Sequence, residues 1–290
     1  MPATVETRAL DAPGATLTYD IHPATSPSEH PPLFILGSPM EAAAFATLAG
    51  HFTDRTVLTY DPRGTGRSPL ADPVGETDPA QHAADLQRVL DDAKLDRVDV
   101  FATSGGAVNA LAWIARHRPA VRTLVAHEPP TAQFLPDRET VLAVVTDMAD
   151  TYQADGEGPA MAKFIALVSQ QGPLPADYLD GPAPDPAMFG LPADDNGSRT
   201  NPLLGLNMRT CSAYEHDIAA LHASTTRIVI ATGATSGQQF AARAADAFAA
   251  NGFEHTLVPG DHTGFLGGEH GQYGEPDAFA AALHQILDNN

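Results

Sequence analysis

The stretch RVDVFATSGGA, residues 97–107, decides how this chain folds and where its chemistry lies. A short run of apolar and β-branched residues leads to Ser104, and small residues then lead directly into a helical pattern. A tight turn from a strand into a helix forces unfavourable dihedral angles on the serine and needs small neighbours, which Ala102, Gly105 and Gly106 supply. The pattern is typical of a nucleophile elbow, which projects the serine hydroxyl from the end of the strand. The alternative for this stretch taken alone is an ordinary serine N-cap followed by a glycine turn.

Similar apolar runs recur along the chain, each followed by a turn and a helical pattern. The predicted strands are residues 33–36, 57–60, 98–101, 124–126, 228–230 and 255–258, and the predicted helices between and after them are residues 79–93, 106–117, 238–250 and 277–287. Nearly continuous apolar strands are typical of a parallel sheet that is buried on both faces. The turn Ala-Pro-Gly at residues 12–14 lies between two further strand patterns and predicts a leading β-hairpin. We therefore expect an α/β fold with a mostly parallel central sheet flanked by helices.

The alternation of strands and helices breaks between residues 131 and 224. This segment has helical patterns at residues 139–152, 160–171 and 203–221, a Pro-, Gly- and Asp-rich stretch at residues 172–201, and no strand signal. The pattern predicts a helical cap inserted after the sixth strand, with residues 1–130 and 225–290 as the two parts of the core. Apolar residues that are candidates for lining a pocket under the cap are Met40, Met148, Phe164, Met188, Phe189, Leu204 and Met208. For each of them, ordinary packing is the alternative.

A second loop at the same edge of the predicted sheet can complete the site. The sequence LGSPM at residues 36–40 follows the first strand of the core, and Gly37 lets the chain turn beneath the serine. The backbone N–H groups of Ser38 and Gly105 are then candidate donors for an oxyanion hole, because Pro39 has no N–H to donate. A plain β-turn is the alternative for this loop.

A base and an acid are expected at that edge as well. His262 follows the last predicted strand, and imidazole takes and returns a proton near neutral pH without a large pKa shift. The turn after the preceding strand, residues 230–238, contains no carboxylate, whereas Glu128 directly follows the strand at residues 124–126. Glu128 is therefore the predicted acid that orients the imidazole. The remaining alternatives are Asp261 and Asp137.

Composition disfavours several classes of function. The 290 residues include 16 Lys and Arg against 36 Asp and Glu, a formal net charge of −20, which disfavours binding to nucleic acid or to anionic lipid. Cys211 is the only cysteine, and no His, Asp and Glu spacing resembles a metal site, so we expect no disulfide, metal or cofactor. Residues 1–10 show no signal-peptide pattern, and no apolar run reaches the roughly 20 residues of a membrane span. We expect a cytoplasmic protein with a small-molecule substrate, and a homodimer stays open.

The order and strand context of Ser38, Ser104, Glu128 and His262 resemble the α/β-hydrolase superfamily. The sequence YDPRGTGRS at residues 60–68 also looks like the turn after the fourth strand of that superfamily. The resemblance covers the two core segments and implies the α/β-hydrolase fold. It also implies that this turn is structural and packs near the oxyanion loop.

A narrower resemblance concerns the acid. The sequences SGGA at residues 104–107 and HEPP at residues 127–130, with a Gly-Ala-Thr turn that lacks an acid, look like the zearalenone lactonase group. That resemblance implies a Ser–Glu–His triad with its glutamate after the sixth strand. It bears on the triad and not on the substrate.

The sequence therefore predicts a serine hydrolase that cleaves an ester or lactone of a small, mostly apolar molecule. Ser104 would attack the carbonyl, His262 would transfer the proton, and Glu128 would orient His262. Two other classes stay open. One is a C–C bond hydrolase or cofactor-free oxygenase on the same fold, and the other is a non-catalytic ligand-binding protein.

Overall fold

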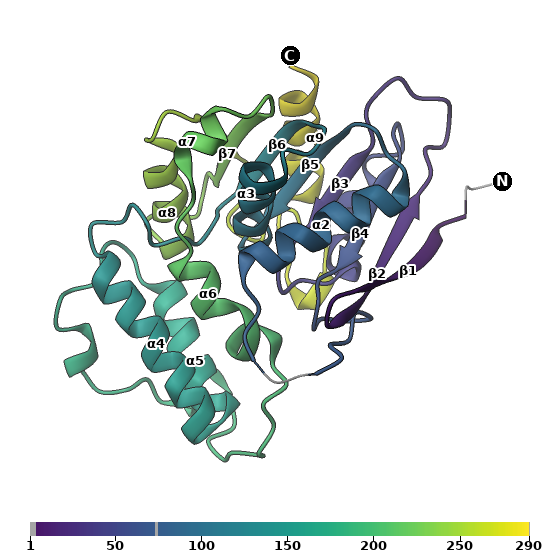
Figure 1. Ribbon diagram of the computed structural model, residues 1–290. Helices are drawn as coiled ribbons and strands as arrows, with labels where there is room; N and C mark the ends of the chain where they lie inside the picture. Colours follow the sequence, from purple (N-terminus) through teal and green to yellow (C-terminus); the bar gives the residue numbers. More distant parts are fainter. Residues whose placement is uncertain (1–3, 73–74, 290) are drawn as a thin grey trace.

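The computed structural model describes residues 4–72 and 75–289, and in this part of the chain eight strands form one sheet (Figure 1). The strands are β1 (Glu6–Ala12), β2 (Ala15–His22), β3 (Leu33–Leu36), β4 (Val57–Asp61), β5 (Val98–Thr103), β6 (Val121–His127), β7 (Arg227–Gly233) and β8 (Glu254–Val258). Their order in the sheet is β1-β2-β4-β3-β5-β6-β7-β8. The pairs β1–β2 and β2–β4 are antiparallel, and the other pairs are parallel. The predicted mostly parallel α/β sheet is confirmed.

The leading hairpin is confirmed too. Ala12 and Ala15 are paired across the β1–β2 turn, which leaves two residues in the loop. Gly14 has φ 75°, a left-handed conformation that glycine adopts without steric cost. The turn chemistry visible in the sequence therefore sets the register of the antiparallel edge.

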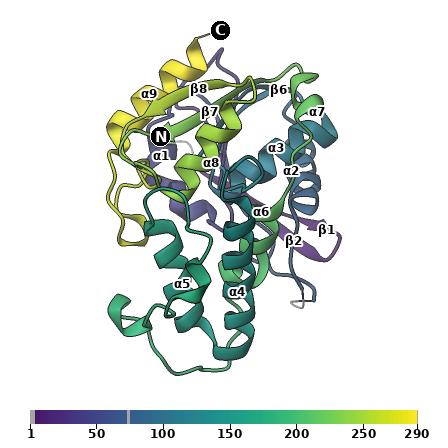
Figure 2. The same ribbon diagram turned by 90° about the vertical axis from the view of Figure 1, so that its left-hand side faces the viewer.

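Helices cover both faces of the sheet (Figures 1 and 2). The core helices are α1 (Ala46–Gly50), α2 (Pro79–Ala93), α3 (Gly105–His117), α8 (Phe240–Ala249) and α9 (Pro276–Asp288). Successive side chains of a strand point to opposite faces. In β3, Phe34 and Leu36 accordingly pack in one core cluster with α2 and α3, whereas Leu33 and Ile35 pack in the other with α1 and α9. Burial of β3 on both faces explains its continuous apolar sequence.

The start of α2 is specified locally. Asp78 Oδ1 accepts a hydrogen bond from the Gln81 backbone N–H at 2.9 Å, and Gln81 Oε1 accepts one from the Asp78 N–H at 3.1 Å. This capping box satisfies two backbone groups, and Pro79 occupies the first helical position, where no N–H is needed.

The segment between β6 and β7 forms no strand among the described residues. It contains α4 (Arg138–Asp155), α5 (Glu157–Ser169), α6 (Met208–Ala213) and α7 (Ile218–His222), three of which, α4, α5 and α6, extend to one side of the core in Figure 1. Short 3₁₀ helices at Tyr178–Asp180 and Pro186–Phe189 interrupt the Pro-rich stretch. The domain limits at residues 130 and 224 stay a prediction.

The sequence pattern predicted one helix over residues 203–221, and this prediction is wrong because the segment is broken into shorter elements. Residues 203–221 form a π-helical turn, Leu203–Asn207, then α6, an extended residue at Tyr214 (ψ 131°) and finally α7. The break has a local cause, because Asp217 caps a new helix by accepting a hydrogen bond from the Ala220 N–H at 2.9 Å.

None of the helices in residues 4–72 and 75–289 is both long enough and apolar enough to cross a bilayer.

Candidate active site

Ser104 lies at the sharp turn between β5 and α3, with φ 55° and ψ −134°. A non-glycine residue in this region of dihedral space is strained, and such strain is concentrated at functional sites. Its backbone N–H donates to the His127 carbonyl at 2.9 Å, so β6 holds the turn in place. The strand–serine–helix turn expected from the sequence is therefore present.

The two glycines after Ser104 allow the loop at residues 37–40, which carries the candidate oxyanion donor Ser38, to approach. A Cβ on Gly105 would lie 2.6 Å from the Ser38 carbonyl oxygen, and one on Gly106 would lie 2.6 Å from the Gly37 Cα. Both distances are too short for any side chain, so the close packing of the two loops requires glycine at both positions.

The two candidate oxyanion donors lie on these neighbouring loops. Ser38 is only 3% exposed, and Gly105 is the first residue of α3, where a backbone N–H has no partner within the helix. Among the described residues, neither amide donates a backbone hydrogen bond in a turn or loop. Two free N–H groups beside a helix N-terminus can stabilise a negative oxygen.

His262 and Glu128 form a short hydrogen bond, with His262 Nδ1 2.6 Å from Glu128 Oε2. The other carboxylate oxygen, Oε1, accepts from the Gly233 N–H at 2.8 Å and from the Ser236 hydroxyl at 2.5 Å. Glu128 has φ 46°, and its side chain is 1% exposed. The turn after β6 thus directs a fully bonded carboxylate at the imidazole.

The surroundings keep this carboxylate ionised. Burial is the largest influence and raises the pKa of Glu128. The hydrogen bond from His262, the nearby imidazoles of His127 and His262, and the hydrogen bond from Ser236 together outweigh it and lower the pKa to about 2. A negative Glu128 can hold His262 in the tautomer that leaves Nε2 free to accept a proton.

The alternative acids lie elsewhere. Asp261 Oδ1 accepts from the Thr263 N–H and from its hydroxyl, both at 2.8 Å. Asp137 is paired with Arg243 at 2.8 Å and caps the Leu174 N–H at 2.8 Å. Neither carboxylate forms a hydrogen bond with His262 in the described part of the chain, so Glu128 is the carboxylate that the fold brings to this imidazole.

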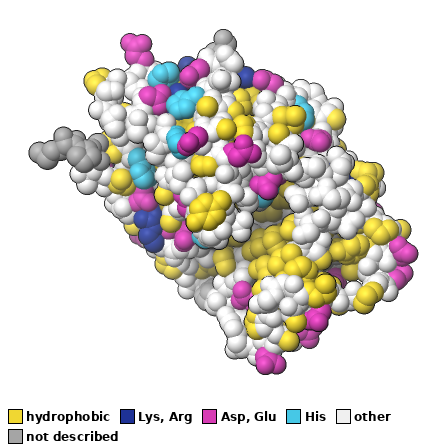
Figure 3. Space-filling view, turned by 180° about the vertical axis from the view of Figure 1, so that it is seen from behind, with side chains coloured by type: hydrophobic (Ala, Val, Ile, Leu, Met, Phe, Trp, Pro, Cys, Tyr) yellow, Lys and Arg dark blue, Asp and Glu magenta, His cyan; other side chains and the backbone are white. Residues whose placement is uncertain are grey.

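Ser104 and His262 line the same cavity of about 480 Å³, together with Ser38 and Gly105. Its walls also include the apolar side chains of Phe164, Val168, Leu203, Met208 and Phe240, mostly from the cap. A hollow bordered by hydrophobic side chains is visible on the cap side of the molecule in Figure 3. No hydrogen bond joins the Ser104 hydroxyl to His262 among the described residues, and in catalytic sites this contact often tightens only when substrate binds.

The predicted lining residues fall into three groups. Phe164 and Met208 line the large cavity, and Met40 lines a smaller one of about 300 Å³ on another side of Ser104. Met148 and Leu204 do not line the large cavity, because both pack in the apolar core of the cap, where they are 1% and 5% exposed. Met188 and Phe189 do not line it either, because the 3₁₀ helix Pro186–Phe189 presents them to solvent with 79% and 37% of their surfaces exposed.

Three residues near this site were not predicted. Ser236 donates to Glu128, His127 stacks on His262 with ring centroids 5.9 Å apart, and Asn207 from the cap accepts from Ser38 Oγ at 3.1 Å. Ser236 lies in the turn at residues 230–238, where the sequence pattern shows only that a carboxylate is absent. Nothing local marks Asn207, which lies 169 residues after Ser38.

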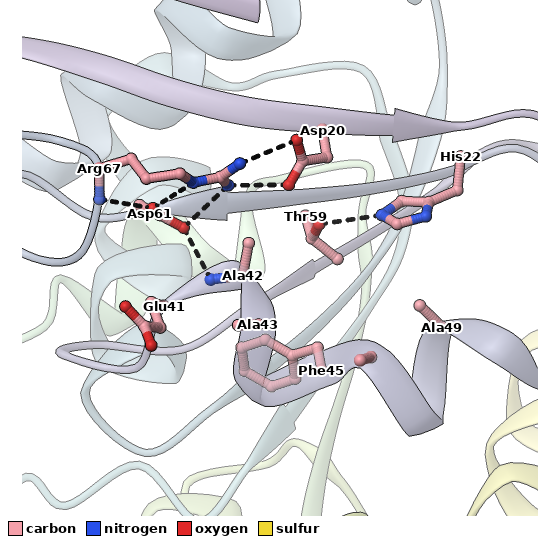
Figure 4. A pocket seen from close by; sticks show the side chains of 11 residues that line it. Asp20, His22, Glu41, Ala42, Ala43, Phe45, Ala49, Thr59, Asp61 and Arg67 are labelled. Carbon is pink, nitrogen blue, oxygen red and sulfur yellow. Dashed lines mark hydrogen bonds and ion pairs between the residues drawn. The ribbon is translucent and has the colours of Figure 1, made fainter. Parts of the chain in front are cut away.

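The loop at residues 60–68 is held by charges that satisfy one another (Figure 4). The Arg67 guanidinium donates to Asp61 at 2.8 Å and to Asp20 at 2.8 Å, and Asp61 Oδ1 also accepts from the Ala42 N–H at 2.8 Å. Ala42 begins the short helix that follows residues 37–40. The loop at residues 60–68 therefore helps to hold this helix in place. The adjoining cavity of about 320 Å³ is not lined by Ser104, Glu128 or His262.

In residues 4–72 and 75–289, no group of three or more His, Cys, Asp and Glu side chains is placed so that it could hold a metal ion.

Known proteins share this architecture. A family model described as alpha/beta hydrolase fold matches residues 33–266. The chain is 27% identical over 293 residues to the uncharacterized hydrolase YraK of Bacillus subtilis (strain 168), and the match covers 98% of this chain and 97% of that protein.

Solved structures agree at the level of fold. A thermophilic esterase from Thermogutta terrifontis matches with a TM-score of 0.64 and 16% identity, covering 98% of each chain. The enol-lactonase from Burkholderia xenovorans matches with a TM-score of 0.64 and 17% identity, covering 97% of this chain and 99% of that one. With the family model matching most of its length, the chain belongs to the alpha/beta hydrolase fold family.

Proposed function

We propose that this hydrolase is a serine esterase or lactonase that cleaves a small, mostly apolar molecule through an acyl-enzyme on Ser104. The observation that carries the proposal is the 2.6 Å contact between His262 and Glu128 at the cavity that Ser104 lines. A strained serine, an oriented imidazole and two free amide donors are the parts that acyl transfer requires.

The chemistry follows from these positions. Ser104 Oγ attacks the ester carbonyl carbon while His262 Nε2 takes the hydroxyl proton, and the carbonyl oxygen becomes an oxyanion facing the Ser38 and Gly105 N–H groups. Collapse of this intermediate breaks the bond to the alkoxy oxygen, and the imidazolium returns its proton to the leaving alcohol. Water, deprotonated by His262, then attacks the acyl-enzyme, the bond to Ser104 Oγ breaks, and His262 returns the proton to Oγ as the acid leaves.

The substrate class rests on the shape and polarity of the cavity. A volume of about 480 Å³ with walls of Phe164, Met208 and Phe240 accommodates a small apolar acyl or ring system. An esterase and an enol-lactonase share this fold, which supports an oxygen ester as the bond that is cleaved. A zearalenone-like lactone is one member of the substrate class, and membership of the zearalenone lactonase group stays a prediction.

The test is covalent labelling. The purified protein is incubated with a fluorophosphonate, its intact mass is measured, and the adduct is mapped, with Ser104→Ala as the control. We expect a single adduct on Ser104 and none in the variant, followed by turnover of members of an ester and lactone panel.

The rival functions give different results. Labelling of Ser104 with conversion of substrates that contain no ester would indicate C–C bond hydrolysis or cofactor-free oxygenation instead. An unlabelled Ser104, with an apolar ligand that raises the melting temperature and is recovered unchanged, would indicate a binding protein.

A further inference from the structure

A buried polar cluster joins the cap to the oxyanion loop. Asn207, the last residue of the π-helical turn Leu203–Asn207, is 2% exposed, and its Oδ1 accepts a hydrogen bond from Ser38 Oγ at 3.1 Å. The same oxygen lies 3.1 Å from His82 Nε2 and 3.3 Å from Thr77 Oγ1. The cluster therefore connects three segments that are distant in sequence: the loop after β3, the start of α2, and the cap.

The orientation of the Asn207 amide follows from its other partner. Its Nδ2 donates to the Pro202 carbonyl at 3.1 Å, so the oxygen faces the hydroxyls and the imidazole. Burial lowers the pKa of His82 to about 4, so the ring is neutral near pH 7, and in its Nε2–H tautomer it donates to Asn207. His82 Nδ1 has no hydrogen-bond partner among the described residues, but the other polar atoms of the cluster bond to one another or to the Pro202 carbonyl, and such a buried network restrains its geometry.

Ser38 is thereby held from two sides. Its carbonyl oxygen packs against Gly105, where a Cβ would approach to 2.6 Å, and its hydroxyl is bound by Asn207. With its carbonyl and hydroxyl engaged, Ser38 has its backbone N–H left to donate a hydrogen bond into the cavity. Ser38, Asn207 and Ser104 all line that cavity.

We propose that Asn207 is a positioning residue of the cap that holds Ser38 so that its N–H faces the oxyanion. The π-helical turn is the device that brings the Asn207 side chain onto Ser38, since a π turn changes the direction of the side chains that follow it, and such turns occur frequently at functional sites. The inference rests on the proposed function, because it assigns the cap a part in stabilising the transition state. A correctly seated cap is then required for chemistry and not only for enclosing the substrate.

The test compares Asn207→Leu, which removes both polar groups, with Asn207→Asp, which keeps an acceptor for Ser38. Removing an oxyanion donor outright costs about 100- to 1000-fold in kcat, so misplacing one by Asn207→Leu should cost about 10- to 100-fold. KM should change by less than about threefold, and the rate of fluorophosphonate labelling should fall in parallel with kcat. Asn207→Asp should recover most of the lost kcat.

A double-mutant cycle shows whether the effect passes through Ser38. Ser38→Ala keeps the backbone N–H and removes only the hydroxyl that Asn207 holds. If Asn207 acts by holding Ser38, the loss in Ser38→Ala/Asn207→Leu is close to that of Asn207→Leu alone. Fully additive losses would overturn the proposal.

The matched control is Tyr152→Phe, which removes another cap hydrogen bond, from the Asn201 N–H at 2.9 Å, without contacting Ser38. It should lower the melting temperature and leave kcat unchanged. If Asn207→Leu behaves in the same way, Asn207 is merely structural and the proposal is wrong.

A crystal structure of Asn207→Leu separates this inference from the proposed function. Absence of labelling in the wild-type protein would refute the proposed function, whereas a turn at residues 37–40 that does not move in Asn207→Leu would refute the positioning role whether or not Ser104 is labelled.

Discussion

His262 Nδ1 lies 2.6 Å from Oε2 of Glu128, a carboxylate supplied by the strand before the cap and not by the strand after it. The strand after the cap contributes instead the Gly233 N–H and, in its turn, the Ser236 hydroxyl, both of which bind the same carboxylate. The two core segments on either side of the cap therefore meet at Glu128. The position of the Glu128 carboxylate therefore depends on the correct packing of the two core segments against each other.

Glu128→Gln should lower kcat by about 10⁴-fold, because an amide at this position can hold His262 in the wrong tautomer and cannot stabilise the imidazolium. The measurement is steady-state hydrolysis of an activated ester. Asp261→Asn, which removes another carboxylate that lines the large cavity, is the matched control and should retain activity. A loss of less than about tenfold in Glu128→Gln would transfer the role to another acid.

Gly105→Ala should reduce kcat by about 100-fold or more, because its Cβ would lie 2.6 Å from the Ser38 carbonyl and must displace an oxyanion donor. Gly50→Ala is the control, since a Cβ there meets nothing within 4 Å. Circular dichroism and hydrolysis assays on both variants check the prediction. Wild-type activity in Gly105→Ala would show that the two loops do not form the oxyanion site.

Asp85→Ala should lower the free energy of unfolding by about 3–5 kcal/mol, because it leaves a buried guanidinium without its partner. Arg63 donates to both oxygens of Asp85, at 2.6 and 2.7 Å, and Asp85 is fully buried. Denaturant titration measures the change. Glu254→Gln, which breaks a partly exposed pair with Arg227, should cost only about 0–1 kcal/mol, and equal losses in the two variants would contradict the argument.

His216→Phe should make the protein less sensitive to acid. Burial lowers the pKa of His216 to about 3, and neither ring nitrogen has a hydrogen-bond partner among the described residues. Because the folded-state pKa lies below the unfolded value of about 6.5, the stability that this group contributes is fully present above about pH 6.5 and is lost as the pH falls toward 3.

The slope over that range is about 1.4 kcal/mol per pH unit for one such group, and His216→Phe should remove it. A phenyl ring also suits the neighbouring rings of Tyr214 and Phe248, whose centroids lie 4.9 and 5.2 Å from that of His216. Urea titrations of the two proteins between pH 4 and pH 7 provide the measurement. Equal slopes in the variant and the wild-type protein would show that His216 does not titrate on unfolding.

The sequence predicts well the features that are specified within a few residues. The β-hairpin at the turn of residues 12–14 and the small residues around Ser104 follow from short-range needs of the backbone, namely a left-handed turn at Gly14 and the close approach of two loops at Gly105. The helix predicted over residues 203–221 is wrong in its continuity because the apolar periodicity does not reveal that Asp217 begins a new helix. Periodicity in the cap also could not separate Met208, which lines the cavity, from Met148, which packs inside the cap.

By itself, the sequence determined the α/β sheet, the strained serine between β5 and α3, and the edge of the sheet at which His262 and Glu128 emerge. These follow from periodicity, from turn chemistry and from the rule that the ends of parallel strands share one edge. Only the tertiary structure decided that Glu128 and not Asp261 binds His262. It also decided that Ser236 donates a hydrogen bond to the Glu128 carboxylate and that Asn207 accepts one from Ser38. Each of these contacts joins residues more than 100 positions apart, and such contacts depend on how the sheet closes and how the cap is seated, which no local propensity encodes.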